Sequence, residues 1–456
     1  MKKDLIISIS GLRGIVGENL NASTAMNYGC AFGTFLKKSK GKKKLTIIIG
    51  SDGRASGDML KSATAAGLCS VGANVIDLGI VITPTVGVMT RQLECDGGIV
   101  ITASHNTIEY NGIKLLTSKG IAPPAGMAET IKSIFSKADF SFVSSADCGK
   151  ITTNRHGDSV HIKKILAYIR RNQIAPKRFN VVLDSINGAG GRPTKRLLAV
   201  FSCHVTAIND VATGMFAHKP EPLAENLTHL CDVVKKTRAD IGFAQDPDGD
   251  RLAVIDENGR YIGEEYTLAL AAKYTFSHKK GTAVTNLSTS RMIDDIAREA
   301  GCEVIRTPVG EVNVAQAMVK NNCIIGGEGN GGVIDLHTGP VRDSLVAIAI
   351  ILQLCAETGK KISQLVDEIP AYEMTKQKFD ADKKQTAKII TQAKKTFKKA
   401  KVDESDGCRF DFDNGWIHLR ASNTEPVIRL IAEFKKDAKS KTHLNKITAI
   451  IEKATG

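Results

Sequence analysis

Three aspartates at alternate positions in the segment QDPDGDRL have the spacing of a divalent-cation site. Asp246, Asp248 and Asp250 bring three carboxylates together within five residues, and alternate side chains of an extended segment point the same way. Crowded carboxylates repel one another unless a cation neutralises them. Hard oxygen ligands suit Mg²⁺, which usually keeps room for a phosphate oxygen. The segment therefore predicts a Mg²⁺ site in preference to a solvated acidic turn.

A calcium-binding EF-hand loop is the competing interpretation of the same aspartates. Glu257 falls at the twelfth position of such a loop, where a bidentate glutamate is required. Arg251, however, stands at the sixth position, where the sharp turn needs glycine. The flanking segments also have the apolar character of strands, so Mg²⁺ is favoured.

Two further loops offer groups that suit a phosphorylated sugar. In RASNTEPVIR, guanidinium, hydroxyl, amide and backbone donors form a natural phosphate cradle, although a surface turn with two salt-bridged arginines would have the same sequence. In GEGNGG, glycines permit close backbone approach, and a carboxylate and an amide suit vicinal sugar hydroxyls, although alone it reads as a loop. The candidate ligands are Arg420, Ser422, Asn423, Thr424 and Arg429 in the first loop and Glu328 and Asn330 in the second.

A serine follows an apolar run in the stretch ITASHNTIEYNGIKLL, which spans residues 101–116. A turn of hydroxyl and amide residues that bond their own backbone would explain this stretch without any chemistry. The chain has no G-x-S-x-G elbow, so a hydrolase triad has little support. With a Mg²⁺ site and a phosphate cradle in the same chain, phosphoryl transfer through Ser104 is the favoured interpretation.

Three stretches of the chain share one order of elements, and each ends in one of these polar loops. Each reads as a buried strand, a polar loop, an amphipathic helix, a second strand, another helical stretch and a third strand. They begin LTIIIGSDGRASG, FNVVLDSINGAGGR and GTAVTNLSTSR and end at TASHN, DPDGDR and GEGNGG. The strands are continuously apolar, as expected when both faces of a sheet are covered. Because sites form outside the carboxyl ends of strands in open α/β sheets, the three loops are expected to converge on one cleft.

After about residue 370 the sequence changes character. A basic helical stretch is followed by CRFDFDNGWIHLRAS, which alternates like two strands around an Asn-Gly turn. We therefore predict an α/β protein in which three similar α/β domains with mixed sheets are followed by a smaller α+β domain, around a central cleft. The predicted domains span residues 1–152, 153–255, 256–370 and 371–456.

The composition limits the partners. Of 456 residues, 42% are hydrophobic and 24% charged, as in ordinary globular proteins. The net charge of +14 favours anionic partners, but aromatic residues are only 5% and no stacking platform interleaves with the basic runs. No apolar run approaches the ~20 residues of a membrane-spanning helix, and the cysteines are scattered singly, as in reduced proteins. We expect a cytoplasmic protein that binds phosphorylated metabolites, with no nucleic-acid or membrane partner.

Taken together, the loops resemble those of the α-D-phosphohexomutase family, in the family's order and over nearly the whole chain. GLRG around Arg13 resembles its N-terminal active-site loop, TASHN its phosphoserine loop and DPDGDR its Mg²⁺ loop. GEGNGG resembles its sugar-recognition loop and RASNTEPVIR its C-terminal phosphate-binding loop. The resemblance implies four domains, the first three with a common topology. The chain departs from the family at Thr107, which is usually proline, and at Asn330 and Gly332, which are often serine and histidine.

The resemblance implies a reversible shift of phosphate between C6 and C1 of a hexose. Phosphorylated Ser104 would donate its phosphoryl group to the bound monophosphate, and the bisphosphorylated sugar would turn around and return its other phosphate. Ser104 and the three aspartates would hold Mg²⁺, and Glu328 and Asn330 the sugar. The C-terminal loop would hold the phosphate that is not transferred. The remaining implied catalytic residues are Lys114 as general acid/base, His105 as its alternative, Arg251 as a phosphoryl-positioning group, and Arg13.

The loop variants look most like those of archaeal-type phosphoglucosamine mutases and phosphomannomutases. The resemblance around GEGNGG predicts glucosamine phosphate as the sugar, with mannose and glucose phosphates as alternatives. Two other classes stay open: a Mg²⁺-dependent sugar phosphatase and a non-catalytic phosphosugar-binding protein. The sequence leaves open whether the protein is a monomer or a homodimer.

Overall fold

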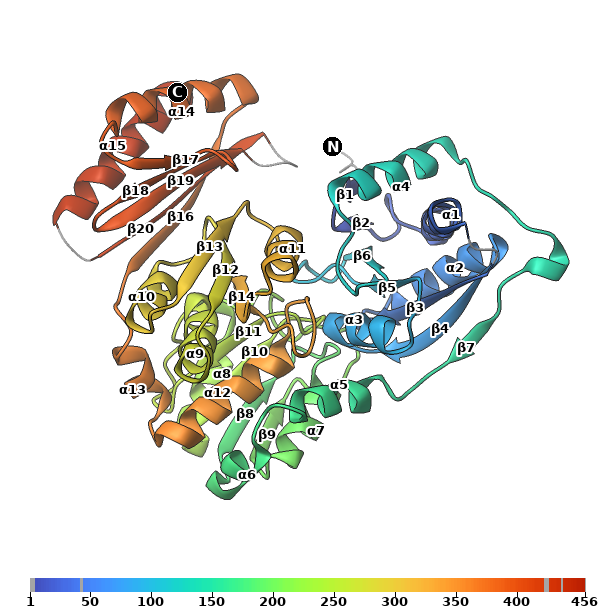
Figure 1. Ribbon diagram of the computed structural model, residues 1–456, viewed down its shortest axis with the longest axis horizontal. Coiled ribbons are helices and arrows are strands. Elements are labelled where there is room, and N and C mark those ends of the chain that lie inside the picture. Colours follow the sequence, from blue (N-terminus) through green and yellow to red (C-terminus); the bar gives the residue numbers. More distant parts are fainter. Residues whose placement is uncertain (1–4, 42–43, 422–425, 436–437, 456) are drawn as a thin grey trace.

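The three predicted repeats form three sheets with one strand order in the computed structural model, which describes residues 5–41, 44–421, 426–435 and 438–455 (Figure 1). In each sheet the first strand of the repeat lies between the third and the second, and all three are parallel. These strands are β3 (Leu45–Ser51), β4 (Ala73–Ile80) and β5 (Gly97–Ile101); β8 (Asn180–Asp184), β9 (His204–Ile208) and β10 (Ile241–Gln245); and β12 (Thr282–Asn286), β13 (Glu303–Thr307) and β14 (Ile325–Glu328).

An antiparallel strand follows the third strand of every repeat, so the sheets are mixed, as predicted. It pairs directly with the strand before it, and the polar loop that carries the candidate residues connects the two. These strands are β6 (Tyr110–Thr117), β11 (Leu252–Ile255) and β15 (Gly332–Ile334). The first sheet is extended to seven strands by β1 (Ile6–Ser8), β2 (Gly11–Ile15) and β7 (Ile151–Thr153).

Helices connect the strands of the first three units. The first unit holds α1 (Ala22–Lys40), α2 (Gly57–Ser70), α3 (Thr83–Gln92) and α4 (Ala125–Lys137). The second holds α5 (Gly157–Leu166), α6 (Arg171–Ile174), α7 (Gly191–Val200) and α8 (Thr228–Thr237). The third holds α9 (Glu264–His278), α10 (Met292–Glu299), α11 (Glu311–Asn321), α12 (Ser344–Thr358) and α13 (Ile362–Asp367).

The fourth unit is a separate α+β layer with an entirely antiparallel sheet, in agreement with the predicted change of character (Figure 1). Its strand order is β16-β20-β19-β18-β17, and it has a hydrophobic cluster of its own. Its elements are β16 (Glu373–Asp380), α14 (Lys383–Thr396), β17 (Lys401–Asp403), β18 (Cys408–Phe412), β19 (Gly415–Ala421), β20 (Val427–Phe434) and α15 (Ala438–Thr455).

The second and third units share one hydrophobic core, and helix α12 is part of it. Its sequence SLVAIAIILQLCAET is apolar on every side, and it packs against α5, α6 and α7 of the second unit and α9 of the third. An all-round apolar helix must be buried. Asp343 caps its N-terminus by accepting hydrogen bonds from the Leu345 and Val346 N–H groups. The metal loop and the sugar loop therefore extend from two units that share one core.

The described part of the chain contains no helix with the length and apolar character that a membrane crossing requires.

Candidate active site

The three aspartates of the metal loop converge directly after β10. Asp246, Asp248 and Asp250 are fully buried, and one carboxylate oxygen from each lies within 4.8 Å of the others. They converge because residues 246–250 form a turn, in which Gly249 has a φ of 64° and the Asp250 N–H donates to Asp246. The predicted convergence is thus present, but the extended segment from which it was inferred is not.

Side chains from other units take up part of this negative charge. Lys114 Nζ on β6 lies 2.6 Å from Asp248 Oδ2 and 3.4 Å from Asp250 Oδ2. Thr83 Oγ1, at the start of α3, donates to Asp248 Oδ2 at 2.6 Å, and Arg342 Nη2 donates to Asp250 Oδ2 at 2.7 Å. Although burial opposes its charge, the two carboxylates raise the pKa of Lys114. Burial and the neighbouring aspartates raise the pKa of Asp246.

Two carboxylate oxygens of the cluster have no hydrogen-bond partner among the described residues. Asp248 Oδ1 and Asp250 Oδ1 are buried without a hydrogen bond, whereas the Oδ2 atoms of the same side chains are paired. Buried acceptors are normally satisfied, so these oxygens indicate a missing ligand. An all-oxygen donor set of carboxylates fits Mg²⁺, and Ser104 lies beside it. The residues present therefore fit the predicted cation.

We predict that Asp248→Asn weakens Mg²⁺ binding by at least about tenfold, the lower end of the loss seen for residues that only support a metal ligand. The reason is that the cluster loses one of three negative charges. Titration calorimetry with Mg²⁺ measures this without any turnover. Asp232→Asn, an exposed change on α8 of the same unit, is the matched control. Superimposable titrations for Asp248→Asn and the unchanged protein would show that Asp248 holds no metal.

Ser104 lies directly beside this cluster. Its side chain is almost fully buried, with Oγ 3.3 Å from Asp246 Oδ2 and 3.3 Å from His105 Nδ1. The backbone of Ser104 has a φ of 52°, a left-handed conformation that non-glycine residues adopt only when the surroundings impose it. Its N–H donates to Thr102 Oγ1 at 2.8 Å. The loop thus turns the hydroxyl toward the aspartate cluster of the second unit.

Arg54, which the sequence analysis did not single out, holds the serine loop in this conformation. It lies after β3, is buried, and forms an ion pair with Asp52 at 3.0 Å. Asp52 in turn accepts a hydrogen bond from the Thr102 hydroxyl. Its guanidinium donates to four backbone carbonyls of the loop, those of Ser104, Asn106, Thr107 and Tyr110, at 2.7 to 2.9 Å. The loop therefore has a fixed backbone although Thr107 stands where the family usually has proline.

A cavity of about 240 Å³ opens in front of Ser104. Arg13 on β2 lines it and donates to Asn106 Oδ1 at 2.6 Å, and burial lowers the pKa of Arg13. Arg251 lines it from the metal loop, with Nη1 3.4 Å from Glu221 Oε1. His105 also lines it, and burial and the charge of Arg251 lower the pKa of His105 to about 2. The predicted catalytic residues Arg13, Ser104, His105, Lys114 and Arg251 thus meet at one cavity.

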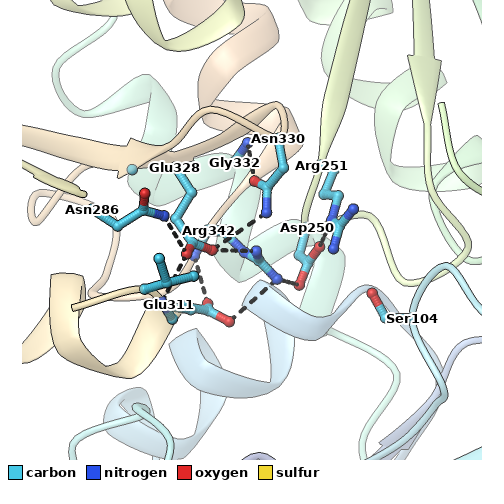
Figure 2. Close-up of polar contacts among 12 residues, drawn as sticks. Ser104, Asp250, Arg251, Asn286, Glu311, Glu328, Asn330, Gly332 and Arg342 are labelled. Atoms are coloured by element: carbon cyan, nitrogen blue, oxygen red, sulfur yellow. Dashed lines mark hydrogen bonds and ion pairs between the residues drawn. The ribbon is translucent and has the colours of Figure 1, made fainter. Parts of the chain in front are cut away.

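The sugar loop forms the opposite wall, and its carboxylate is already engaged. Figure 2 shows Glu328 at the centre of a network. One oxygen accepts from Asn286 at 2.8 Å and from the Gly310 N–H at 3.2 Å. The other accepts from Arg342 at 2.6 Å and from Asn330 at 3.4 Å. Glu328 must therefore exchange partners before it can bind a sugar hydroxyl.

Arg342 is the hub of this network, and sequence reasoning missed it. Its guanidinium bridges Asp250 of the metal loop and Glu328 of the sugar loop, and lies 3.4 Å from Glu311 (Figure 2). Gly332 makes the space for it, because a Cβ there would lie 2.2 Å from Arg342 Cδ. The departure from histidine at Gly332 therefore leaves the space that the Arg342 side chain occupies. That departure was the one feature of the sequence that could have pointed to Arg342.

Glu311, the first residue of α11, is a second residue that the sequence analysis missed. It lines the cavity, and its side chain is 24% exposed, whereas that of Glu328 is 6% exposed. One oxygen accepts from the Arg342 N–H at 3.1 Å, and burial raises the pKa of its carboxyl. Of the two cavity glutamates, Glu311 has more of its carboxylate open to a ligand.

The two arginines of the C-terminal loop do not line this cavity. Arg420 on β19 and Arg429 on β20 face each other as direct cross-strand partners. Arg420 Nε lies 3.3 Å from Asp406 Oδ2. The other predicted phosphate ligands, Ser422, Asn423 and Thr424, lie outside the described residues.

Comparisons with known proteins match the chain along its whole length. Family models described as phosphoglucomutase/phosphomannomutase alpha/beta/alpha domains I, II and III and C-terminal domain match residues 5–142, 159–259, 263–372 and 374–449. A phosphoglucomutase/phosphomannomutase of Thermococcus kodakarensis is 40% identical over 97% of this chain and 98% of the relative. A "probable phosphoglucosamine mutase" of the same organism is 34% identical over 98% of both chains. The crystal structure of a phosphoglucomutase/phosphomannomutase family protein from Burkholderia thailandensis superposes with a TM-score of 0.87, at 28% identity over 98% of both chains.

Proposed function

Because the chain belongs to the phosphoglucomutase/phosphomannomutase family of α-D-phosphohexomutases, we propose that it moves a phosphate between O6 and O1 of a hexose through Ser104. It is thus a phosphohexomutase, an isomerase that transfers phosphate within one molecule. The observation that carries the role of Ser104 is its position: its buried Oγ lies 3.3 Å from Asp246 and opens onto the cavity.

The first half-reaction starts from phosphorylated Ser104 and a bound hexose monophosphate. The free sugar hydroxyl attacks the phosphorus, the new O–P bond forms, and the bond to Ser104 Oγ breaks. The hydroxyl proton passes to Lys114 or His105, both of which line the cavity. Lys114 can accept it only after losing the proton that Asp248 and Asp250 hold on its amine. Arg13 and Arg251 supply positive charge beside the transferring group. The second half-reaction reverses these steps from the other phosphate, after the bisphosphorylated sugar has turned around.

Asp246, Asp248 and Asp250, with the oxygen of Ser104, would hold Mg²⁺. The ion would spread the negative charge of the transferring phosphoryl group. A bisphosphorylated hexose supplies the phosphate that first loads Ser104, so it acts as both activator and intermediate.

The sugar is held on the third unit and its remaining phosphate on the fourth. Glu328 and Asn330 bind ring hydroxyls, with Glu311 as a further acceptor on the same wall. Arg420, Ser422, Asn423, Thr424 and Arg429 bind the phosphate that is not transferred. Two arginines that face each other across adjacent strands support this assignment, because like charges in that position are unfavourable unless an anion lies between them.

The two alternative functions have less support. A Mg²⁺-dependent phosphatase needs no phosphate grip on a separate unit, so the pair of Arg420 and Arg429 argues against it. A non-catalytic binding protein has no need for Ser104 and the complete aspartate cluster.

The preferred hexose is the finer part of the proposal. The resemblance around GEGNGG predicts glucosamine phosphate, and the relative named as a probable phosphoglucosamine mutase supports this. Glucose and mannose phosphates are the second candidates. They are favoured by the greater identity, 40% against 34%, to the T. kodakarensis relative named phosphoglucomutase/phosphomannomutase.

We expect the purified protein to convert hexose 6-phosphates to 1-phosphates and a fraction of it to carry one extra phosphate. Comparison of kcat/KM for glucosamine, mannose and glucose 6-phosphates identifies the sugar, and a clear preference for glucose or mannose would refute the glucosamine prediction. Intact-mass measurement detects the phosphoenzyme. Release of inorganic phosphate in place of the 1-phosphate would instead identify a phosphatase.

A further inference from the structure

We propose that the Asp406 carboxylate occupies the phosphate's place on Arg420 while the site is empty, and that the phosphate of the substrate displaces it. Asp406 is then a positioning residue that acts through Arg420 and through the cavity loop to which it is tied. The inference rests on the proposed function, because it takes Arg420 and Arg429 as the grip for the phosphate that is not transferred.

The arginine pair has unused binding capacity. Arg420 and Arg429 are direct partners in the ladder between β19 and β20, so their side chains lie on the same face of the sheet. The Nε atoms of both are buried without a hydrogen-bond partner. Asp406 Oδ2 forms an ion pair with Arg420 Nε at 3.3 Å. Asp406 thus neutralises part of the charge of the pair.

The same carboxylate oxygen also binds the backbone of the third unit. Asp406 Oδ2 accepts a hydrogen bond from the Val309 N–H at 2.9 Å. Val309 immediately precedes Gly310 and Glu311, which line the cavity, and the Gly310 N–H donates to Glu328 at 3.2 Å. One oxygen atom therefore connects the phosphate-gripping arginine with the loop that carries the sugar-binding wall.

The backbone around Asp406 is anchored independently of its side chain. The carbonyl of Asp406 lies 2.6 Å from His418 Nε2, and His418 Nδ1 lies 2.9 Å from Ser288 Oγ of the third unit. His418 is fully buried. Displacement of the carboxylate can therefore proceed by a side-chain rotation while the contact between the third and fourth units stays in place.

A phosphate group has the advantage in this exchange. It carries more charge than a carboxylate and offers more oxygens to two guanidinium forks. Phosphate binds fully only to molecules in which Arg420 is free of Asp406. The observed phosphate affinity is therefore the intrinsic affinity multiplied by the fraction of such molecules. When phosphate displaces the carboxylate, the Val309 N–H loses the partner that holds it. The loop at residues 309–311 is then released just as the substrate enters.

The test is Asp406→Asn, which removes the charge but retains an oxygen that can accept from the Val309 N–H. We expect glucose 6-phosphate and inorganic phosphate to bind about threefold to fivefold more tightly by titration calorimetry, the size of a partly exposed ion pair. KM for the hexose phosphate should fall without a rise in kcat. Asp406→Ala should also gain affinity, because the occupied site does not use Asp406.

Asp413→Asn, an exposed change in the turn between β18 and β19, is the matched control and should leave the affinity unchanged. Adding Arg420→Ala to Asp406→Asn should abolish the gain, because the carboxylate then has no arginine for which to compete. Unchanged binding in both Asp406 variants, or weaker binding in the alanine variant that asparagine rescues, would show that Asp406 only supports the fold. If the unchanged protein neither binds nor converts a hexose phosphate, the proposed function itself fails.

Discussion

Replacement of Ser104 by alanine is expected to lower mutase kcat by at least about 10³-fold, because the chain loses the atom that carries the phosphoryl group. Arg13, Lys114 and Arg251 would still line the cavity, but a bound hexose phosphate would have no group with which to exchange phosphate. Measurement of kcat in both directions of the reaction checks the loss. Intact mass after incubation with a bisphosphorylated hexose checks that the extra phosphate is absent.

The fold should survive this change. Within the described part of the chain the Oγ atom makes two hydrogen bonds, both of 3.3 Å, whereas the loop is held through its backbone by Arg54 and Thr102. The melting temperature is therefore expected to match that of Ser133→Ala, an exposed control on α4. A Ser104→Ala protein that keeps half of its turnover, or still acquires the phosphate, would refute the assignment of Ser104 as the phosphoryl carrier.

The fold could be predicted from sequence because its signals are local. Continuous apolar strands, amphipathic helices and the change of character after residue 370 each depend on neighbouring residues. The threefold repetition made the signal stronger than any single stretch. The same repetition predicted that TASHN, DPDGDR and GEGNGG would follow equivalent strands, and β5, β10 and β14 lead into these loops.

The residues that sequence reasoning missed act over long separations in the chain. Arg54 binds the backbone of a loop about fifty residues away, at Ser104, and Arg342 reaches back to Asp250. Neither stands in a segment whose pattern indicates chemistry. Arg54 was nevertheless accessible by topology, because parallel strands β3 and β5 end at the same edge of one sheet. The polar loop after the first strand of this repeat therefore lies beside the loop after the third.

The largest effect on stability is expected from Arg342→Met. Arg342 is buried, and its guanidinium is the cation that Asp250, Glu328 and Glu311 share. Its removal takes from three carboxylates the cation that they share, and breaking a buried charge pair in this way costs about 3–5 kcal/mol. We therefore expect a clearly lower melting temperature in the absence of Mg²⁺ and a marked loss of activity in its presence. Arg298→Met, a change on α10 at a side chain that is 71% exposed, should have little effect.

The dependence on Mg²⁺ distinguishes this mechanism from a simple packing defect. A ligand that binds only the folded state stabilises it more as its affinity rises. Without Arg342, Asp250 has lost its partner of opposite charge at 2.7 Å, so the aspartate cluster attracts a divalent cation more strongly. Thermal unfolding measured over a series of Mg²⁺ concentrations should thus show a larger stabilisation for Arg342→Met than for the unchanged protein. An equal or smaller Mg²⁺ effect in the variant would show that Arg342 does not share the charge of the metal loop. Its loss would then act through packing alone.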